Sequence, residues 1–283
     1  MEVQNLGLIA GNGRYPLLVL EEAIRREITV TVAAIREEAL PEIEEFVNRP
    51  HVSVHWLGLG QLGKLIRVFK GEGVQKAIMA GQVKHSQIFS RKGGDSSGRR
   101  LILPDLKMMK VFMSLPERNT QSLIGGVIEE LEKEGIEFID STVLLASLLP
   151  EVGVLTRREP SREELMDIEY GHPIAQTIAH LDLGQTIVIK DRAVVAVEAM
   201  EGTDETIRRA ARLVGGGRLT VVKVSRPDQD MRFDVPVVGL DTLLVLKECN
   251  VSALAVDAEK TLVLDREEFI READRLEMAV IVH

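Results

Sequence analysis

Short apolar runs alternate with amphipathic helical stretches along almost the whole of this 283-residue chain. The runs LGLIA (6–10), TVTVAAI (29–35) and KAIMAG (76–81) have the length and composition of buried strands. Between them, the stretch that begins at Leu62 repeats its apolar residues at helical spacing and ends in glycines. Strands that alternate with helices form parallel sheets with the crossover helices on their faces. The sequence therefore predicts an α/β fold.

The alternation is interrupted once and then returns, which predicts two domains. Pro150, Gly153 and Pro160 break the periodicity, and a second alternating region follows them. We predict a Rossmann-like α/β domain with a parallel sheet over residues 1–150. A second α/β domain is predicted over residues 151–283, with a substrate cleft between the two.

Further elements follow from the same patterns. The Gly- and Ser-rich stretch at 90–100 predicts a mobile loop. The helices expected after it are at about 104–115, 120–134, 161–180 and from residue 203, and the strands include TIVIK (186–190), AVVAVEA (193–199) and LTVVKV (219–224).

The bulk composition excludes several classes of protein. The net charge of −9 argues against a nucleic-acid-binding protein, because phosphate contacts need clustered Lys and Arg. A single cysteine, Cys249, excludes an intramolecular disulfide and a thiolate-cluster metal site. No apolar stretch approaches the roughly 20 residues of a membrane span. We therefore expect a cytoplasmic protein whose membrane contacts are made at its surface.

A glycine turn follows the first predicted strand. Gly11 and Gly13 lie between that strand and a helix that starts near Tyr15. Glycine lets backbone amides approach a phosphate, and the N-terminus of a helix favours an anion. The dinucleotide-binding fingerprint would place a third glycine where Pro16 stands, so a nicotinamide cofactor is weakly supported. The alternative is a tight turn without a ligand.

A second turn of this kind ends the strand 76–81. Gly81 and Gln82 lie there, followed by Lys84 and His85. Ligands of α/β sheets bind at the carboxyl ends of strands, so we expect both turns to border one crevice. The predicted substrate contacts in this half of the chain are Gly11, Asn12, Gly13, Gly81 and Gln82.

Acidic residues gather after a strand in the second region, in VEAMEGTDET (197–206). Glu198 and Glu201 end an otherwise apolar strand, where carboxylates are costly unless they are solvated or bound to a cation. Thr203 and Asp204 open the next helix, and an N-capping role accounts for these two without a ligand. Capping does not account for the glutamates, which favours a functional role for Glu201 and Asp204.

A second acid-rich loop runs through SRPDQDMRFDVP (225–236). Its acids are Asp228, Asp230 and Asp234, and the bases around them are Lys223, Arg226 and Arg232. Like charges at this density need a solvated loop, neighbouring bases or a bound cation. Two such loops in one domain favour a shared cation site, whose carboxylate oxygens suit Mg²⁺ or Mn²⁺. Zinc is disfavoured, because the histidines are scattered along the chain and Cys249 is alone.

A run of motifs spans the chain: LGLIAGNGRYPLL, LGQLGKLI, MAGQV, LPDLKMMK, GVLTRREPS, LDLGQTIVI, VEAMEGTDETIRRA, SRPDQDMRFDVPVVG and TLVLDREEFI. In this order they resemble the LpxI-type UDP-2,3-diacylglucosamine pyrophosphatases. The resemblance implies two α/β domains, a divalent cation and hydrolysis of UDP-2,3-diacylglucosamine to 2,3-diacylglucosamine 1-phosphate and UMP in lipid A synthesis. It also implies an acylated UDP-sugar substrate bound between the domains, at the cytosolic face of the inner membrane.

The resemblance carries roles to residues of this chain by position. The family's motifs match at Asp234, at Glu201 to Asp204 and at Lys223. From this match and the acidic loops together we expect catalytic roles for Asp234, Lys223 and Arg226, substrate contact for Thr203, and metal binding for Glu201, Asp204 and Asp234. Asp234 is expected to bind the metal or to act as the base that orients water. In one place the chain departs from the family, because Arg118, Asn119 and Thr120 stand where relatives carry Gly-Asp-Asp. Two carboxylates are thereby absent from that corner.

An acylated substrate also needs an apolar surface. LKMMKVFMSL (106–115) has Met108, Met109, Phe112 and Met113 at helical spacing, and methionine adapts to irregular apolar partners. A core-facing stripe is the favoured interpretation, because most apolar helix faces are core. Bases that could meet anionic headgroups are Arg91, Lys92, Arg99 and Arg100.

Three alternatives remain open at this stage. One is a nucleotide-sugar diphosphate hydrolase of a different substrate, and another is a nucleotide-binding protein without catalysis. An NAD-dependent oxidoreductase is the weakest, because no hydride-transfer residues accompany the glycines. Assembly into a homo-oligomer is also left open.

Overall fold

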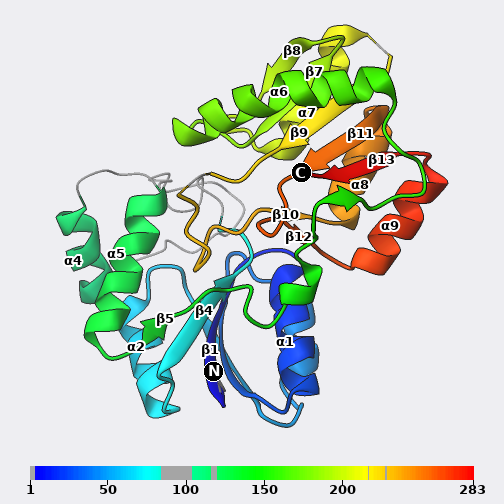
Figure 1. The fold of residues 1–283 in the computed structure, drawn as a ribbon. Coiled ribbons are helices and arrows are strands. Elements are labelled where there is room, and N and C mark those ends of the chain that lie inside the picture. Colours follow the sequence, from blue (N-terminus) through cyan, green and yellow to red (C-terminus); the bar gives the residue numbers. More distant parts are fainter. Residues whose placement is uncertain (1–3, 84–103, 116–119, 216, 227) are drawn as a thin grey trace, which may run out of the picture. The chain divides into compact units, whose positions relative to one another are not determined.

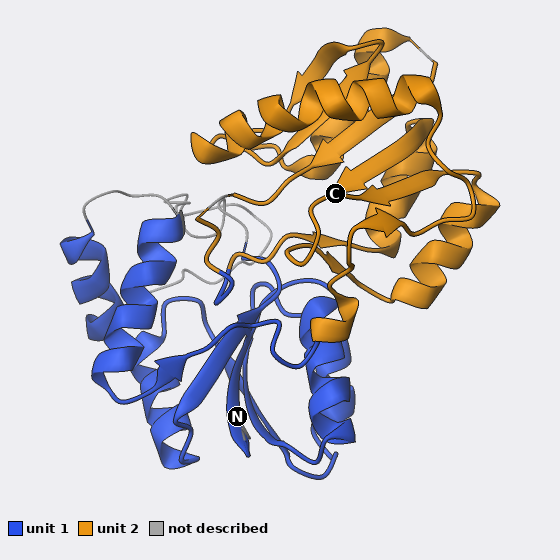
Figure 2. Ribbon diagram, viewed as in Figure 1, with its two compact units in different colours: residues 1–145, 231–233 blue, residues 146–230, 234–283 orange. Residues whose placement is uncertain are grey.

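The computed structural model describes residues 4–83, 104–115, 120–215, 217–226 and 228–283 (Figure 1). The expected loop at 90–100, its four bases, and Lys84, His85, Arg118 and Asn119 lie outside these residues, as does the side chain of Thr120. The chain divides into two compact units, coloured separately in Figure 2. Unit 1 comprises Met1–Leu145 with Met231–Phe233, and unit 2 comprises Ala146–Asp230 with Asp234–His283.

Unit 1 is built on a five-stranded sheet whose strands are all parallel, in the order β3-β2-β1-β4-β5. Its strands are β1 Asn5–Ala10, β2 Thr29–Ile35, β3 Val52–Leu57, β4 Lys76–Ala80 and β5 Glu137–Phe138. Its helices are α1 Tyr15–Arg25, the 3₁₀ helix η1 Pro41–Phe46, α2 Leu62–Gly71, α4 Leu106–Ser114 and α5 Thr120–Lys133. This strand order is that of a Rossmann-like sheet, which confirms the predicted fold of the first domain.

The helices of unit 1 bury the faces that their apolar spacing predicts. In α2, the residues Leu62 and Phe69 belong to the main core cluster of the unit. In α4 the methionine stripe divides between core and surface. Met108 is buried in the same cluster, whereas 46% of Met109 and 85% of Met113 is exposed. The predicted core-facing role therefore holds for Met108 and fails for the other two methionines.

Unit 2 contains a six-stranded mixed sheet in the order β6-β13-β11-β9-β7-β8 (Figure 1). Its strands are β6 Gly153–Val154, β7 Thr186–Lys190, β8 Ala193–Val197, β9 Leu219–Lys223, β11 Val251–Val256 and β13 Ala279–Val282, and β10 Val237–Val238 pairs with β12 Leu262–Val263. Its helices are η2 Ala146–Leu148, α6 Arg162–His180, α7 Thr203–Val214, α8 Leu240–Glu248 and α9 Arg266–Arg275. The predicted second α/β domain is thus confirmed.

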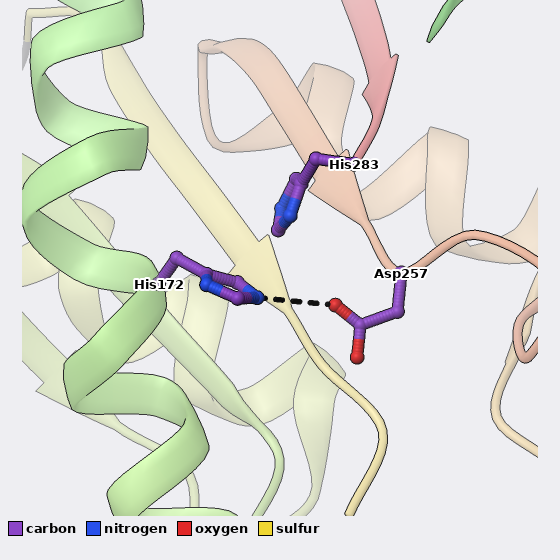
Figure 3. A group of neighbouring side chains, drawn as sticks. All are labelled: His172, Asp257 and His283. Carbon is purple, nitrogen blue, oxygen red and sulfur yellow. Dashed lines mark hydrogen bonds and ion pairs between the residues drawn. The ribbon is translucent and has the colours of Figure 1, made fainter. Parts of the chain in front are cut away.

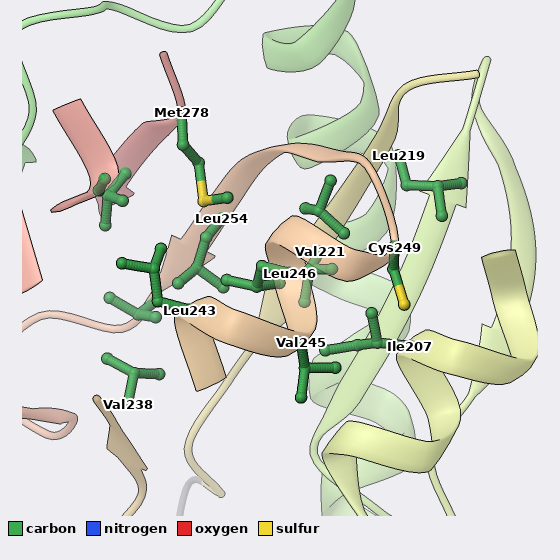
Figure 4. Close-up of a cluster of buried hydrophobic side chains, with 14 of the residues drawn as sticks. Ile207, Leu219, Val221, Val238, Leu243, Val245, Leu246, Cys249, Leu254 and Met278 are labelled. Carbon is green, nitrogen blue, oxygen red and sulfur yellow. The ribbon is translucent and has the colours of Figure 1, made fainter. Parts of the chain in front are cut away.

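Alternate residues of one strand serve the two faces of this sheet. Ile187 and Ile189 of β7 pack in the cluster that contains the buried face of α6. Val188, between them, belongs to the cluster that α7, α8 and α9 cover, drawn in Figure 4. Both faces of the strand are covered, which is why TIVIK is buried at its first four positions and apolar at the three from Ile187 to Ile189.

The direction of the strands determines where polar side chains gather. β9, β11 and β13 run parallel, and β8 runs with them because β7 is antiparallel to both β8 and β9. Three of these strands, β8, β11 and β13, are followed directly by Glu198, Asp257 and His283. The fourth, β9, ends with Lys223. One edge of the unit 2 sheet therefore collects titratable groups from four strand ends.

In these described ranges we find no helix that combines the length and the apolar character needed to cross a bilayer.

Candidate active site

A polar cluster centred on Thr203 lies at the carboxyl edge of the unit 2 sheet. Lys223 Nζ donates a hydrogen bond to Thr203 Oγ1 across 3.0 Å, and Thr203 Oγ1 lies 3.1 Å from Glu198 Oε1 and 3.1 Å from Thr186 Oγ1. Glu198 Oε2 accepts a further bond from the backbone amide of Gln185. Lys223 is 6% exposed and Glu198 8%. Because an unpaired buried polar group is costly, the hydroxyl of Thr203, which joins these two buried side chains, stabilises the cluster.

The start of α7 places Thr203 in this cluster. The N-cap of α7 is Gly202, with a φ of 83°, a left-handed conformation that glycine adopts readily. Thr203 is the first residue of the helix, so the N-capping role that we weighed for it is wrong. Its hydroxyl is instead available to Lys223 and Glu198. Sequence reasoning missed Thr186, whose only signal is a hydroxyl at the start of an apolar strand.

Asp204 follows Thr203 at the surface. Its pKa is raised, first because neighbouring groups remove water from the carboxyl group, and further because Asp241 and Glu198 lie near it. Lys223 and Arg208 oppose this rise. A carboxylate with a raised pKa beside a lysine is chemically suited to accept a proton from water.

Glu201 has partners of its own. Its Oε1 lies 2.6 Å from Arg209 Nη2 and accepts a hydrogen bond from Thr206 at 3.3 Å. The pKa of Glu201 is lowered, because its own backbone amide and Arg209 both donate to the carboxylate. In this structure Glu201, which precedes α7, therefore forms an ion pair with Arg209 of that helix.

Arg226 lies between two aspartates. Its side chain is 10% exposed; one guanidinium nitrogen lies 2.5 Å from Asp182, and another contacts Asp234. Gln229 donates to the backbone carbonyl of Asp234 and accepts from the amide of Arg226, which closes the loop. Burial raises the pKa of Asp234, the charge of Asp182 adds to this, and Arg226 opposes it. Of the three explanations for the clustered acids of this loop, a neighbouring base is the one observed at Asp234.

The three predicted metal ligands do not gather around one point. Glu201 faces Arg209, Asp204 lies beside Lys223, and Asp234 contacts Arg226. They do not form a group whose ligand atoms all lie within 4.8 Å of one another. As they stand, these carboxylates do not fit a shared Mg²⁺ or Mn²⁺ ion, and the shared site stays a prediction.

One group of three ligating side chains within 4.8 Å does occur in the described part of the chain: His172, Asp257 and His283 (Figure 3). His172 Nε2 lies 3.3 Å from Asp257 Oδ1, and the two imidazole rings pack edge to face with centroids 4.2 Å apart. Burial lowers the pKa of His283, and the nearby His172 lowers it further. Zinc was disfavoured because the histidines are scattered along the chain, yet the fold brings two of them together with Asp257.

In unit 1, the two glycine turns lie against each other. The amide of Gly11 donates to the carbonyl of Ala80, and Asn12 and Gln82 exchange two backbone hydrogen bonds of 2.8 and 2.9 Å. A Cβ on Gly81 would lie 2.5 Å from the carbonyl oxygen of Asn12, and the φ of Gly81 is +87°. The close approach of two backbones therefore requires glycine here.

The contact between the two turns affects the backbone amides that were predicted to bind a phosphate. The amides of Gly11, Asn12 and Gln82 donate within the protein. Gly13 has a φ of +98° with open space where its Cβ would be, as a sharp turn requires. Substrate contact at these residues stays a prediction.

Comparison with known proteins places the chain in a family. A family model described as the LpxI N-terminal domain matches residues 5–148, and one described as the LpxI C-terminal domain matches residues 151–281. A protein of Caulobacter vibrioides named UDP-2,3-diacylglucosamine pyrophosphatase LpxI is 29% identical over 289 residues, which cover 99% of this chain and 97% of that protein. Both halves of the chain are matched, in order, and the motif resemblance is confirmed. The chain belongs to the LpxI family.

Proposed function

We propose that this chain hydrolyses the pyrophosphate of UDP-2,3-diacylglucosamine to 2,3-diacylglucosamine 1-phosphate and UMP, in lipid A biosynthesis. The observation that carries the proposal is the family match over residues 5–148 and 151–281, because it includes both domains. The similar protein of Caulobacter vibrioides, aligned over 99% of this chain, bears the name of this activity.

The reaction needs positive charge near the diphosphate. Water adds to one phosphorus, the bond from that phosphorus to the bridging oxygen breaks, and the bridging oxygen leaves on the other phosphate. Lys223 and Arg226 are suited to stabilise the charge that builds on these oxygens, because both cations are held in place before the substrate arrives. Thr203 holds the lysine, and Asp182 holds the guanidinium group.

The reaction also needs a base that orients and deprotonates water. Asp234 is our first candidate, and Asp204 is the second. Both carboxyl groups have a raised pKa, which makes each a better proton acceptor than an ordinary aspartate. Arg226 fixes the orientation of Asp234.

Dependence on Mg²⁺ or Mn²⁺ is part of the proposal and rests on the family resemblance. Because Glu201, Asp204 and Asp234 do not gather in this structure, we assign no step of the reaction to a metal.

The acyl chains of the substrate need an apolar surface. Leu106, Met109 and Met113 are 84%, 46% and 85% exposed and recur at intervals of three and four residues on α4. Residues at this spacing form one stripe along a helix. We assign this stripe to an acyl chain or to the surface of the inner membrane, with the protein in the cytoplasm.

The test is to incubate the purified chain with UDP-2,3-diacylglucosamine and follow UMP by chromatography. The proposal expects stoichiometric UMP and diacylglucosamine 1-phosphate. UMP release from UDP-N-acetylglucosamine but not from the acylated substrate would favour a hydrolase of a different nucleotide sugar. Binding of UMP without turnover of either compound would favour a nucleotide-binding protein.

A further inference from the structure

His172, Asp257 and His283 come from three different elements of unit 2. His172 lies in α6, Asp257 directly follows β11, and His283 directly follows β13 (Figure 3). Two ligand atoms that are each about 2.1 Å from a zinc ion lie about 3.4 Å apart at the tetrahedral angle. The 3.3 Å between His172 Nε2 and Asp257 Oδ1 already matches that spacing. Each of the three side chains offers a ligand atom, and these atoms all lie within 4.8 Å of one another, so shifts of roughly 1 Å bring them to the spacing found around one ion.

The carboxylate of Asp257 is oriented from behind. Its Oδ2 accepts hydrogen bonds from the backbone amide of Ser225 at 2.7 Å and from Gln176 Nε2 at 3.2 Å. Asp257 is 7% exposed, and its Oδ1 is the atom that faces His172. Ligating carboxylates are commonly held in this way by hydrogen bonds to the oxygen that does not bind the metal.

The backbone of His283 is fixed as well. Its amide donates to Val256 and its carbonyl accepts from Ala258. The ring nitrogen Nε2 is buried, and within the described residues it has no hydrogen-bond partner. Because a buried polar atom without a partner is costly, a native structure seldom retains one without a ligand or a functional reason. The ring of His283 lies next to the side chains of His172 and Asp257 (Figure 3), and each of the three offers a ligand atom within 4.8 Å of the other two.

The group is accessible from solvent. The His172 side chain is 35% exposed. His172 and His283 line a surface pocket of about 330 Å³, together with Leu165, Ile168 and Pro173. Three protein ligands beside a pocket leave a coordination position open, as in sites that bind a water molecule or a small ligand on the metal.

We propose that His172, Asp257 and His283 bind one divalent transition-metal ion, such as Zn²⁺ or Co²⁺. Two imidazole nitrogens and one carboxylate oxygen suit these ions, whereas Mg²⁺ prefers oxygen ligands alone. The site is therefore distinct in its chemistry from the hard-cation requirement proposed for the reaction.

The experiment is calorimetric titration of the full chain with ZnCl₂, after removal of metals with EDTA and in a large excess of Mg²⁺. We expect one Zn²⁺ per chain. His172→Gln and His283→Gln should each weaken binding at least about 100-fold, because each removes a ligand. His180→Gln, which changes an exposed histidine of the same helix, should bind as the wild type does. Circular dichroism of each variant confirms that it is folded.

Two results would overturn the proposal. One is wild-type protein that binds no stoichiometric Zn²⁺, and the other is unchanged affinity in both ligand variants. The visible absorption of bound Co²⁺ gives a second readout: its intensity reports ligand number, and it should be lost in His283→Gln and kept in His180→Gln. Neither readout depends on turnover, so failure of the proposed hydrolysis would not be mistaken for failure of this site.

Discussion

Lys223 Nζ donates a hydrogen bond to Thr203 Oγ1 across 3.0 Å, which joins the end of β9 to the first residue of α7. Thr203 in turn donates to Glu198, so the buried cation has a compensating charge one hydroxyl away. Thr203 thus holds the lysine in one position, and it links the lysine to Glu198 through its hydroxyl group. A phosphate oxygen can take a hydrogen bond from this ammonium group while the cluster stays intact.

Replacing Lys223 by Met should lower kcat/KM roughly 100-fold or more, which is the usual loss when one preorganised donor to a developing charge is removed. Methionine fills most of the same space, so the fold should be retained. Steady-state UMP release measures the effect, and circular dichroism checks folding. Lys247→Met, at an exposed position on α8, is the matched control and should retain full activity. A kcat/KM equal to that of the wild type in Lys223→Met would show that this lysine takes no part in the reaction.

Replacing Asp234 by Asn should reduce kcat by about 100-fold to 10,000-fold, the range that general base catalysis contributes. Arg226 would keep its 2.5 Å contact with Asp182, so the loop should stay folded. Asp182→Asn is the control, because it removes the other carboxylate partner of the same arginine and leaves Asp234 in place. If both variants lose activity equally, the effect belongs to the position of Arg226 and not to a base at Asp234.

Replacing Gly81 by Ala should destabilise unit 1. The φ of +87° costs an alanine about 1–2 kcal/mol, and the Cβ would lie 2.5 Å from the carbonyl oxygen of Asn12, which adds about 1–3 kcal/mol of overpacking. Gly135 separates the two effects, because its φ is +85° but nothing lies within 4 Å of its Cβ position. Urea unfolding should therefore show a clearly larger loss for Gly81→Ala than for Gly135→Ala. Equal losses would mean that the two backbones do not approach closely.

Glu134 gives a prediction for pH dependence. Its carboxylate accepts hydrogen bonds from Lys70 and Lys107, which lower its pKa from the usual 4.5 to about 2. A lowered pKa means that the ionised form stabilises the fold, fully above about pH 4.5 and decreasingly as the pH falls through about 2. Glu134→Gln should therefore be less stable than wild type at neutral pH, and the difference should shrink on acidification.

Urea unfolding at several pH values measures this difference in the free energy of unfolding. Glu129→Gln, an exposed change on the neighbouring helix α5, controls for the change in net charge. A difference for Glu134→Gln that stays constant down to the acid limit would show that the two lysines do not act on this carboxylate.

The fold followed from the sequence because its determinants are local. TIVIK reads as a strand and is β7, Thr186–Lys190, and the helix expected over 161–180 is α6, Arg162–His180. The alternation of strands and helices then restricts the sheets to mainly parallel ones. Unit 1 matches this expectation fully, and unit 2 departs from it at β6 and β7, which are antiparallel to their neighbours.

The site followed from the sequence only in part, because its contacts join distant segments. The sequence indicates Lys223, Thr203, Arg226 and Asp234 as site residues. It does not indicate that Thr203 bonds Lys223 or that Arg226 contacts Asp234. His172 and Asp257 are 85 residues apart, and no local spacing signals their meeting. A partial signal existed, since a polar residue directly after a buried strand marks the sheet edge.

Removal of metal tests the cation requirement. EDTA should abolish UMP release, and added Mg²⁺ or Mn²⁺ should restore it, as the family resemblance predicts. If only Zn²⁺ restored UMP release, the required ion would be assigned to the site formed by His172, Asp257 and His283. Full activity in EDTA would contradict a metal requirement.

The central claim is that this chain cleaves UDP-2,3-diacylglucosamine. Its most direct test is the rate of UMP release from that substrate by the wild-type chain, with Mg²⁺ present and Asp234→Asn prepared in parallel as the blank. We predict multiple turnovers for the wild type and only trace release for the variant. Release by the wild type no faster than by the variant, from folded protein, would contradict the assignment.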